Sequence, residues 1–408
     1  MFSISAREDG GEENAMGWMG LLLRKGRLEK DWSQEGLCKG ICAVSYLSKI
    51  EQGKVEPSPE IMKLLFVRLG LAWQGEDAAR QTAEWIERAY DALFSMEEDA
   101  WEELWRQMGD GRESMCCGPG MIDFLLLESW EKKAQDPFLQ ECQEWMSPRQ
   151  RALWLMEQGR CQEALSLQGD GWFHFIAGRD CYQKGDYVQA RALLGKGFAL
   201  AAEECRPRLM LECKLFLGNC CSDTGRYADM LSHYRGARRL AQALRDENAM
   251  RDIRYNVAST DLFFGRAEEA LNYFENISAP TAMDLHKRAV CLEKLGRRDQ
   301  AREALDQARQ ASAFFPSREI ADDMCQLVRY RLEHPEYLKD AAYGEMLLRL
   351  FETLRRELPM GYVLFHLPWV EEWYVANRQY RQAWQLMRDF PEYRRSGRFR
   401  REIWIGFS

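Results

Sequence analysis

The side chains best able to act as nucleophiles or metal ligands are scattered along this chain of 408 residues. None of its five histidines stands at metal-ligand spacing from another: they are His174, His233, His286, His334 and His366. The thirteen cysteines are spread through helical patterns, and the adjacent pairs Cys116-Cys117 and Cys220-Cys221 would point in divergent directions on a helix. We find no glycine-rich phosphate loop of the Walker or dinucleotide type. The sequence therefore predicts a protein that is not an enzyme and that uses no metal or other cofactor.

Polar side chains with an informative spacing lie within residues 32–54, which have the pattern of two short helices joined by a tight turn. Ser33 can cap the first helix by accepting a hydrogen bond from a free backbone N–H, and Gly40 can end it. In the second helix an apolar stripe is expected to pack inward, formed by Val44, Leu47 and Ile50. The residues left facing outward are Ala43, Ser45, Tyr46 and Lys49. This is the pattern of a helix-turn-helix, which indicates DNA binding, although a helix pair with a glycine turn also occurs in many other all-α proteins.

At these residues the chain resembles the lambda-repressor-like (XRE) helix-turn-helix family, whose pattern runs from Ser-Gln through a glycine turn to Ser-Tyr-Leu-Ser-x-Ile-Glu-x-Gly. The longer form of the turn found here, Gly-Ile-Cys-x-x-Ser-Tyr-Leu, is similar to that of the peptide-pheromone-responsive regulators of Gram-positive bacteria, the RRNPP group. After the turn, Ser58 and Pro59 have the pattern of an N-cap and a first helical residue. The resemblance predicts a five-helix-type DNA-binding domain over residues 16–70, here named the helix-turn-helix module.

The helix-turn-helix resemblance also assigns roles to individual side chains in binding a double-stranded DNA operator. Contacts with base edges are expected from the recognition helix, through Ala43, Val44, Ser45, Tyr46 and Lys49. Gln34 and Lys54 are expected to contact phosphates, which set the position of the protein on DNA and do not read its sequence.

Charge is distributed unevenly along the chain, whose net charge is −8. Residues 16–70 carry nine Lys/Arg against six Asp/Glu, whereas residues 71–150 carry seven against eighteen. DNA contacts should therefore be confined to the helix-turn-helix module and depend strongly on salt. We expect residues 1–15 to be a flexible tail. Residues 71–150, here named the connector, are predicted to be acidic and helical, with room for the first repeat-like helices; direct mimicry of DNA by the connector is an alternative role.

Residues 151–395 contain an internal repeat, here named the array. Its turn glycines recur at intervals of 40, 40 and 31 residues: they are Gly185, Gly225, Gly265 and Gly296. These intervals lie on either side of the tetratricopeptide (TPR) period of about 34 residues. Five residues after each glycine comes a small or apolar residue: Ala190, Met230, Ala270 and Ala301. Weaker units begin at Gly159 and Arg378, the second with a first helix expected after Pro368. We predict about six to eight helix pairs forming a right-handed TPR α-solenoid, followed by a tail over residues 396–408.

A TPR solenoid has a concave groove lined by the first helix of each pair. In register with the turn glycines, the residues expected to face this groove are Phe175, Arg179, Leu215, Asn219, Asp223, Tyr255, Ser259, Phe263, His286 and Val290. An asparagine amide offers a donor and an acceptor that can pair with any peptide backbone. The resemblance to pheromone-receptor repeats implies this role for Asn256, while the alternative is that Asn219 and Asn256 only bridge adjacent helices.

The resemblance to the RRNPP group covers nearly the whole chain and implies an all-α regulator in two parts. The array would bind a short signalling peptide, alter the arrangement of a homodimer and so change how the protein binds its operator. An alternative is an adaptor or repressor whose array binds a protein partner. The chain has no apolar run near the ~20 residues needed to span a bilayer and no signal peptide, so we expect a cytoplasmic protein without a membrane partner.

Overall fold

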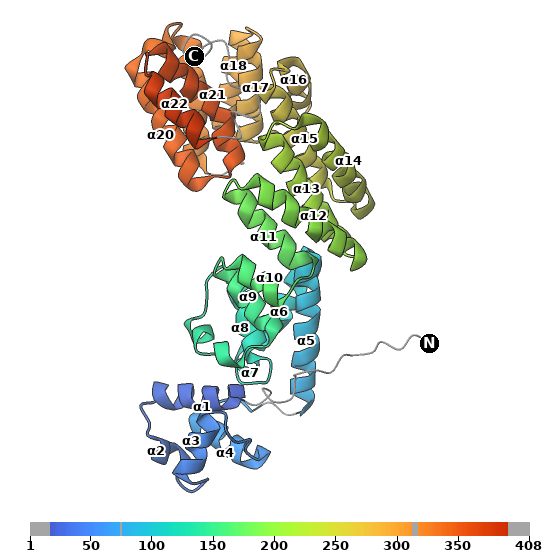
Figure 1. Cartoon of the computed structure of the whole chain (residues 1–408), viewed down its shortest axis with the longest axis vertical. Helices are drawn as coiled ribbons and strands as arrows, with labels where there is room; N and C mark the ends of the chain where they lie inside the picture. Colours follow the sequence, from blue (N-terminus) through green and yellow to red (C-terminus); the bar gives the residue numbers. More distant parts are fainter. Residues whose placement is uncertain (1–16, 74–75, 312–316, 391–408) are drawn as a thin grey trace. The chain divides into compact units, whose positions relative to one another are not determined.

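The computed structural model describes residues 17–73, 76–311 and 317–390, and throughout these residues the regular elements are helices (Figure 1). The chain divides into two compact units between Ala177 and Gly178, a boundary inside α11 (Gly171–Gln183). The prediction of an all-α fold is therefore confirmed. Each unit is described by itself below.

The helix-turn-helix module begins the first unit. Its helices are α1 (Gly17–Glu29), α2 (Gln34–Cys38), α3 (Val44–Glu51) and α4 (Pro59–Leu69). The Ser33 side chain accepts a hydrogen bond of 3.0 Å from the Gly36 N–H, which confirms the predicted N-cap of α2. Gly40 has a φ of 73° in the turn between α2 and α3, a left-handed conformation that favours glycine. The cap of α2 and the glycine turn thus stand where the sequence predicted them, and α3, the expected recognition helix, follows that turn.

The rest of the first unit is helical as well. It contains α5 (Glu76–Ser95), α6 (Glu98–Asp110), α7 (Arg112–Met115), α8 (Met121–Lys132), two short 3-10 turns (Pro137–Gln140 and Gln143–Trp145), α9 (Pro148–Glu157) and α10 (Cys161–Leu167). Aromatic rings form part of its core, since the Phe94 ring centroid lies 5.0 Å from that of Trp172. Acidic side chains are neutralised locally: the buried Glu128 carboxylate pairs with both Arg112 and Lys132.

The second unit is a series of antiparallel helix pairs joined by tight turns. After α11 come α12 (Tyr187–Glu203), α13 (Pro207–Asp223), α14 (Tyr227–Leu244), α15 (Glu247–Phe263), α16 (Ala267–Glu275), α17 (Ala282–Lys294), α18 (Arg298–Gln310), α19 (Arg318–Glu333), α20 (Ala341–Glu357), α21 (Met360–Ala376) and α22 (Tyr380–Asp389). Together with α9 and α10, these helices make seven consecutive pairs, in agreement with the predicted number.

The turn glycines are the feature that repeats most faithfully in the array. Their φ angles are 79°, 76°, 83° and 74° at Gly185, Gly225, Gly265 and Gly296. The helices of a pair also approach each other closely: a Cβ built on Gly218 would lie 2.3 Å from the Tyr234 ring. The four small or apolar residues predicted to pack the second helix on the first are fully buried. The repeat inferred from sequence is confirmed.

One element boundary in the array differs from the prediction. Pro368 was expected to precede a helix, but it lies inside α21, which runs from Met360 to Ala376. Most side chains from Val363 to Glu371 are buried, so tertiary packing of an apolar helix outweighs the backbone hydrogen bond that proline removes. The N-terminal end of α21 lies against α13, where a Cβ on Gly361 would be 3.4 Å from the Asp223 carboxylate.

Candidate functional sites

The helix α3 presents a row of exposed side chains. Ala43, Ser45 and Lys49 are exposed, Tyr46 is half-buried, and Lys54 is exposed just beyond the helix. Val44 is 42% exposed, so the expectation that it packs inward is wrong: Leu47 and Ile50 alone of that stripe are buried. Val44 is the first residue of α3, where the helix emerges from the turn. Val44 is thus exposed, as are Ser45 and Lys49 of the same helix.

A buried carboxylate ties three helices of the module together. Glu51, at the end of α3, accepts two hydrogen bonds from the Arg27 guanidinium of α1, at 2.7 and 2.9 Å. The same carboxylate accepts a hydrogen bond of 2.8 Å from the Gln34 amide of α2. A bidentate pair shielded from water is stronger and more directional than a surface ion pair. Gln34, expected to contact a phosphate, therefore also fixes the angle between α2 and α3.

Backbone contacts add to this positioning of α3. A Cβ on Gly20 of α1 would lie 1.9 Å from the Ile50 carbonyl oxygen, so only glycine allows α1 to approach α3 this closely. On the other side, the Arg68 guanidinium of α4 donates a hydrogen bond of 2.8 Å to the Leu37 carbonyl at the end of α2. The recognition helix is thus held on a rigid support.

The module also contacts the connector within the first unit. The indole ring of Trp145 fills the space beside Gly53, where a Cβ would lie 2.1 Å from the nearest ring carbon. The Lys25 ammonium lies 4.0 Å from the centroid of the Phe138 ring, a cation–π contact. Both aromatic residues belong to the short 3-10 turns before α9. The turn that ends the recognition helix is therefore packed against the connector.

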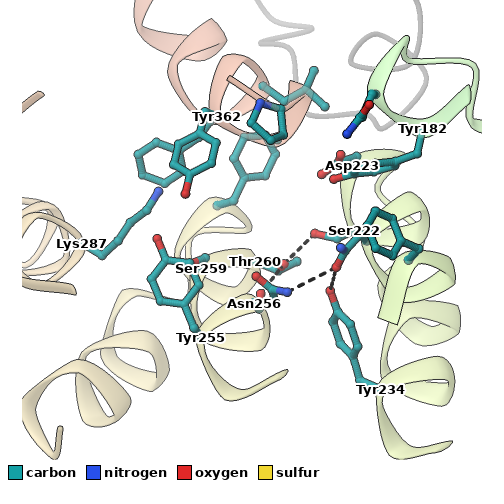
Figure 2. Close-up of a pocket in the computed structure, with 18 residues that line it drawn as sticks. Tyr182, Ser222, Asp223, Tyr234, Tyr255, Asn256, Ser259, Thr260, Lys287 and Tyr362 are labelled. Atoms are coloured by element: carbon teal, nitrogen blue, oxygen red, sulfur yellow. Dashed lines mark hydrogen bonds between the residues drawn. The ribbon is translucent and has the colours of Figure 1, made fainter. Parts of the chain in front are cut away.

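In the second unit a cavity of about 350 Å³ lies among α11, α13, α15, α17 and α21 (Figure 2). Six residues predicted to face a peptide groove line it: Asn219, Asp223, Tyr255, Asn256, Ser259 and Phe263. Sequence reasoning missed other lining residues, which include Ser222, Thr260, Lys287, Tyr362 and Phe365. Ser222 and Thr260 follow predicted residues at helical spacing, so that signal was present in the sequence. The residues from α21 carried no such signal, because their position depends on a contact between segments far apart in the chain.

A polar network crosses from α13 to α15 at the wall of the cavity. The side-chain oxygen of Asn219 accepts hydrogen bonds from the Tyr234 hydroxyl at 2.6 Å and from the side-chain amide of Asn256 at 3.3 Å. The hydroxyls of Ser222 and Thr260 are 2.7 Å apart, as Figure 2 shows. The two asparagines therefore do bridge adjacent helices. In the described part of the chain, the Asn219 amide nitrogen and the Asn256 side-chain oxygen form no further hydrogen bond, which leaves one donor and one acceptor at the cavity.

Other polar groups on the wall of the cavity differ in whether they have hydrogen-bond partners. The Asp223 carboxylate accepts a hydrogen bond of 3.1 Å from the Tyr187 hydroxyl. The hydroxyl oxygens of Tyr255 and Ser259 are buried and interact with each other, and neither meets a partner at full hydrogen-bonding geometry among the described residues. Burial raises the pKa of Tyr255 well above its ordinary value, so this phenol stays protonated and can donate. The cavity thus combines aromatic surface with unsatisfied hydrogen-bonding groups.

Several residues expected to face the groove are not available there. His286 is only 1% exposed, and its ring lies 6.2 Å from that of His366 in α21, so α21 covers it. Phe175 and Val290 are likewise buried, which makes the groove prediction wrong for all three. Arg179 is half-buried on α11 and does not line the cavity. Burial lowers the pKa of Arg179, and nearby Glu212 opposes that change.

Neither a metal site nor a membrane span emerges from the described ranges. They hold no group of three or more His, Cys, Asp or Glu side chains arranged to bind a metal ion. No helix in the same residues has the length and apolar character needed to cross a bilayer.

Comparison with known proteins supports the two-part architecture. Residues 23–74 match the family model described as "Helix-turn-helix". A search of curated protein sequences gave no significant match. Among solved structures, a Rap protein complexed with Competence and Sporulation Factor is similar over 77% of this chain and 98% of its own, with 16% identity and a TM-score of 0.57. The apo form of the quorum sensor NprR from B. thuringiensis is similar over 76% and 99%, with 14% identity and a TM-score of 0.51.

These findings define a protein whose described residues form an N-terminal helix-turn-helix domain and a helical solenoid. Its fold is similar to that of Rap and NprR, two representatives of the RRNPP group of peptide-responsive regulators, as the sequence motifs predicted.

Proposed function

We propose that this chain is a cytoplasmic, non-catalytic transcriptional regulator. Its helix-turn-helix module binds operator DNA, and its array binds a short signalling peptide in the cavity of the second unit. The observation that carries the proposal is the convergence of six predicted groove residues on one cavity, in a chain whose residues 23–74 match a helix-turn-helix family. The similar Rap structure was solved in complex with Competence and Sporulation Factor, and NprR is described as a quorum sensor.

Peptide binding would use the free amide groups of the α13–α15 network. The Asn219 amide nitrogen can donate to a peptide carbonyl, while the Asn256 oxygen can accept from a peptide N–H. Because these groups meet the peptide backbone, they hold a ligand of any sequence; the aromatic side chains of Tyr255 and Phe263 would then select among side chains.

DNA binding would use a homodimer, as is usual for helix-turn-helix proteins that read inverted repeats. Two recognition helices then meet successive major grooves about 34 Å apart. For a peptide to act on this arrangement, it must bind one arrangement of the dimer more tightly than the other. This requirement makes the dimer, rather than the single chain, the switching unit.

The first test is selection of genomic fragments by the purified protein at moderate salt, followed by sequencing. We expect one short inverted repeat to be enriched. Tyr46→Ala and Lys49→Ala should each weaken binding to that repeat by about 10-fold or more, since each base contact contributes about 1–3 kcal/mol. Lys196→Ala, at an exposed position on α12, is the control and should bind like the unmodified protein.

Unchanged affinity in both variants would contradict the assignment of α3 as the recognition helix. Enrichment of no sequence, with and without peptides present, would instead favour a protein-interaction adaptor, because its array would then act without reading DNA.

A further inference from the structure

Lys287 is a buried basic residue on the wall of the cavity. It belongs to α17 and is 3% exposed. Its ammonium lies 2.9 Å from the centroid of the Phe365 ring of α21. Among the described residues, Lys287 forms neither an ion pair nor a hydrogen bond. Figure 2 shows its side chain reaching into the same side of the cavity as Tyr255 and Ser259.

Three carboxylates on the elements that carry the cavity are engaged elsewhere. Asp284, one turn before Lys287 on α17, accepts hydrogen bonds from the backbone and hydroxyl of Thr281 and so caps its own helix. Glu293, later on the same helix, pairs with Arg331 of α19 at 2.8 Å. Asp223, on α13, accepts a hydrogen bond from Tyr187. His286 and His366 are neutral, since burial lowers the pKa of both imidazoles, so neither can serve as a counter-ion.

An ammonium without a counter-ion is strongly disfavoured in such a position. Burial lowers the pKa of Lys287 well below its ordinary value. The charged form becomes favourable only when an anion enters, because a desolvated charge needs a partner at close range. The unsatisfied hydroxyls of Tyr255 and Ser259 lie on the same side of the cavity and can donate to that anion. The aromatic lining is suited to the apolar part of the same ligand.

We propose that Lys287 is the receptor for a carboxylate of the bound peptide, with the Tyr255 and Ser259 hydroxyls as additional donors. This inference rests on the proposed function, because it specifies the chemistry of the same cavity. The carboxylate comes either from the C-terminus of the peptide or from an Asp or Glu side chain. Figure 2 shows Lys287 and Asp223 on opposite sides of the cavity, so the site has a positive and a negative end and fixes the direction of the peptide.

The test uses the purified full chain and four libraries of random heptapeptides. Two libraries have a free C-terminal carboxylate and two a C-terminal amide; one of each pair excludes Asp and Glu. Retained peptides are identified by mass spectrometry, and their Kd values are measured for the unmodified chain, for Lys287→Met and for the exposed control Lys196→Met. We expect retention only from libraries that contain a carboxylate. Lys287→Met should weaken these peptides by about 10- to 100-fold, and Lys196→Met should not change their Kd.

The library that contributes the retained peptides identifies the source of the carboxylate. Equal retention of amidated peptides without Asp or Glu, or Kd values unchanged by Lys287→Met, would overturn the carboxylate receptor and leave peptide binding intact. Retention from no library would overturn both proposals.

A second measurement separates loss of the receptor from loss of folding. Methionine is close in shape to the lysine stem and carries no charge, so Lys287→Met should keep or raise the Tm of the peptide-free protein. A lower Tm than that of Lys196→Met would mean that the ammonium is stabilised by the protein itself, which contradicts the proposal.

Discussion

The role of a polar side chain in this protein depends on which of its hydrogen-bonding groups the neighbouring residues leave without a partner. Asn219 and Asn256 bridge two helices, yet each keeps one polar group for a ligand. Glu51 is the opposite case, because Arg27 and Gln34 both donate to its carboxylate. The two asparagines can therefore bind a ligand, whereas Glu51 holds helices of the module together. Residue type alone does not distinguish them, since all of these side chains are polar and partly or fully buried.

Glu157, the last residue of α9, gives a prediction at this scale. One of its carboxylate oxygens is buried without a hydrogen-bond partner, and burial raises its pKa to about 7. Between pH 4.5 and pH 7 the folded chain therefore binds more protons than the unfolded chain, whose glutamates have an ordinary pKa of about 4.5. The free energy of unfolding should fall as the pH rises through this window, by at most about 3 kcal/mol.

Glu157→Gln mimics the protonated acid and should remove this loss. Urea unfolding is measured for both proteins at pH 5 and pH 8. The variant should be more stable than the unmodified chain at pH 8, by about 1–3 kcal/mol, and closer to it at pH 5. The same gain at both pH values would show that ionisation of Glu157 is not the cause.

At the scale of elements, the close contact of α13 with α14 depends on Gly218. A Cβ there would lie 2.3 Å from the Tyr234 ring, so Gly218→Ala should destabilise the protein by about 1–3 kcal/mol through overpacking. Gly195, on α12, is the matched control because nothing lies within 4 Å of its added Cβ. Gly195→Ala should stabilise the protein by about 0.5–1 kcal/mol, because alanine favours a helix. Both values come from urea unfolding, and opposite signs are the diagnostic result.

The repeat could be predicted from sequence because each helix pair is built from local signals. A left-handed turn such as that at Gly225 needs glycine, and a close helix approach such as that at Gly218 needs a small residue. The position of α21 could not be predicted in this way. It depends on packing against α13, more than a hundred residues earlier, and this packing covers His286 and supplies Phe365 to the cavity. Lys287 was missed because the register inferred from the turn glycines placed His286 and Val290 of α17 in the groove.

At the scale of the whole molecule, the proposed function requires that a mutation in the cavity can remove the response to peptide without changing DNA binding by the module. Asn256→Ala removes one backbone contact from the cavity without touching the module. It should abolish the response to peptide, while DNA binding without peptide stays unchanged. The measurement is operator affinity by fluorescence anisotropy, with and without a peptide recovered from the libraries above.

Asn272→Ala, at an exposed position on α16, is the control for this experiment and should keep the response. Loss of DNA binding by Asn256→Ala in the absence of peptide would mean that Asn256 acts through folding. A full response in that variant would assign the asparagine to the helix bridge alone.

The contact between Trp145 and Gly53 links the end of the recognition helix to the connector within the first unit. The indole fills the space beside the turn that ends α3, so that side of the turn is in steric contact with the ring. Any larger side chain at position 53 would collide with this ring. The packing that joins the connector to the end of the recognition helix therefore depends on glycine at this one position.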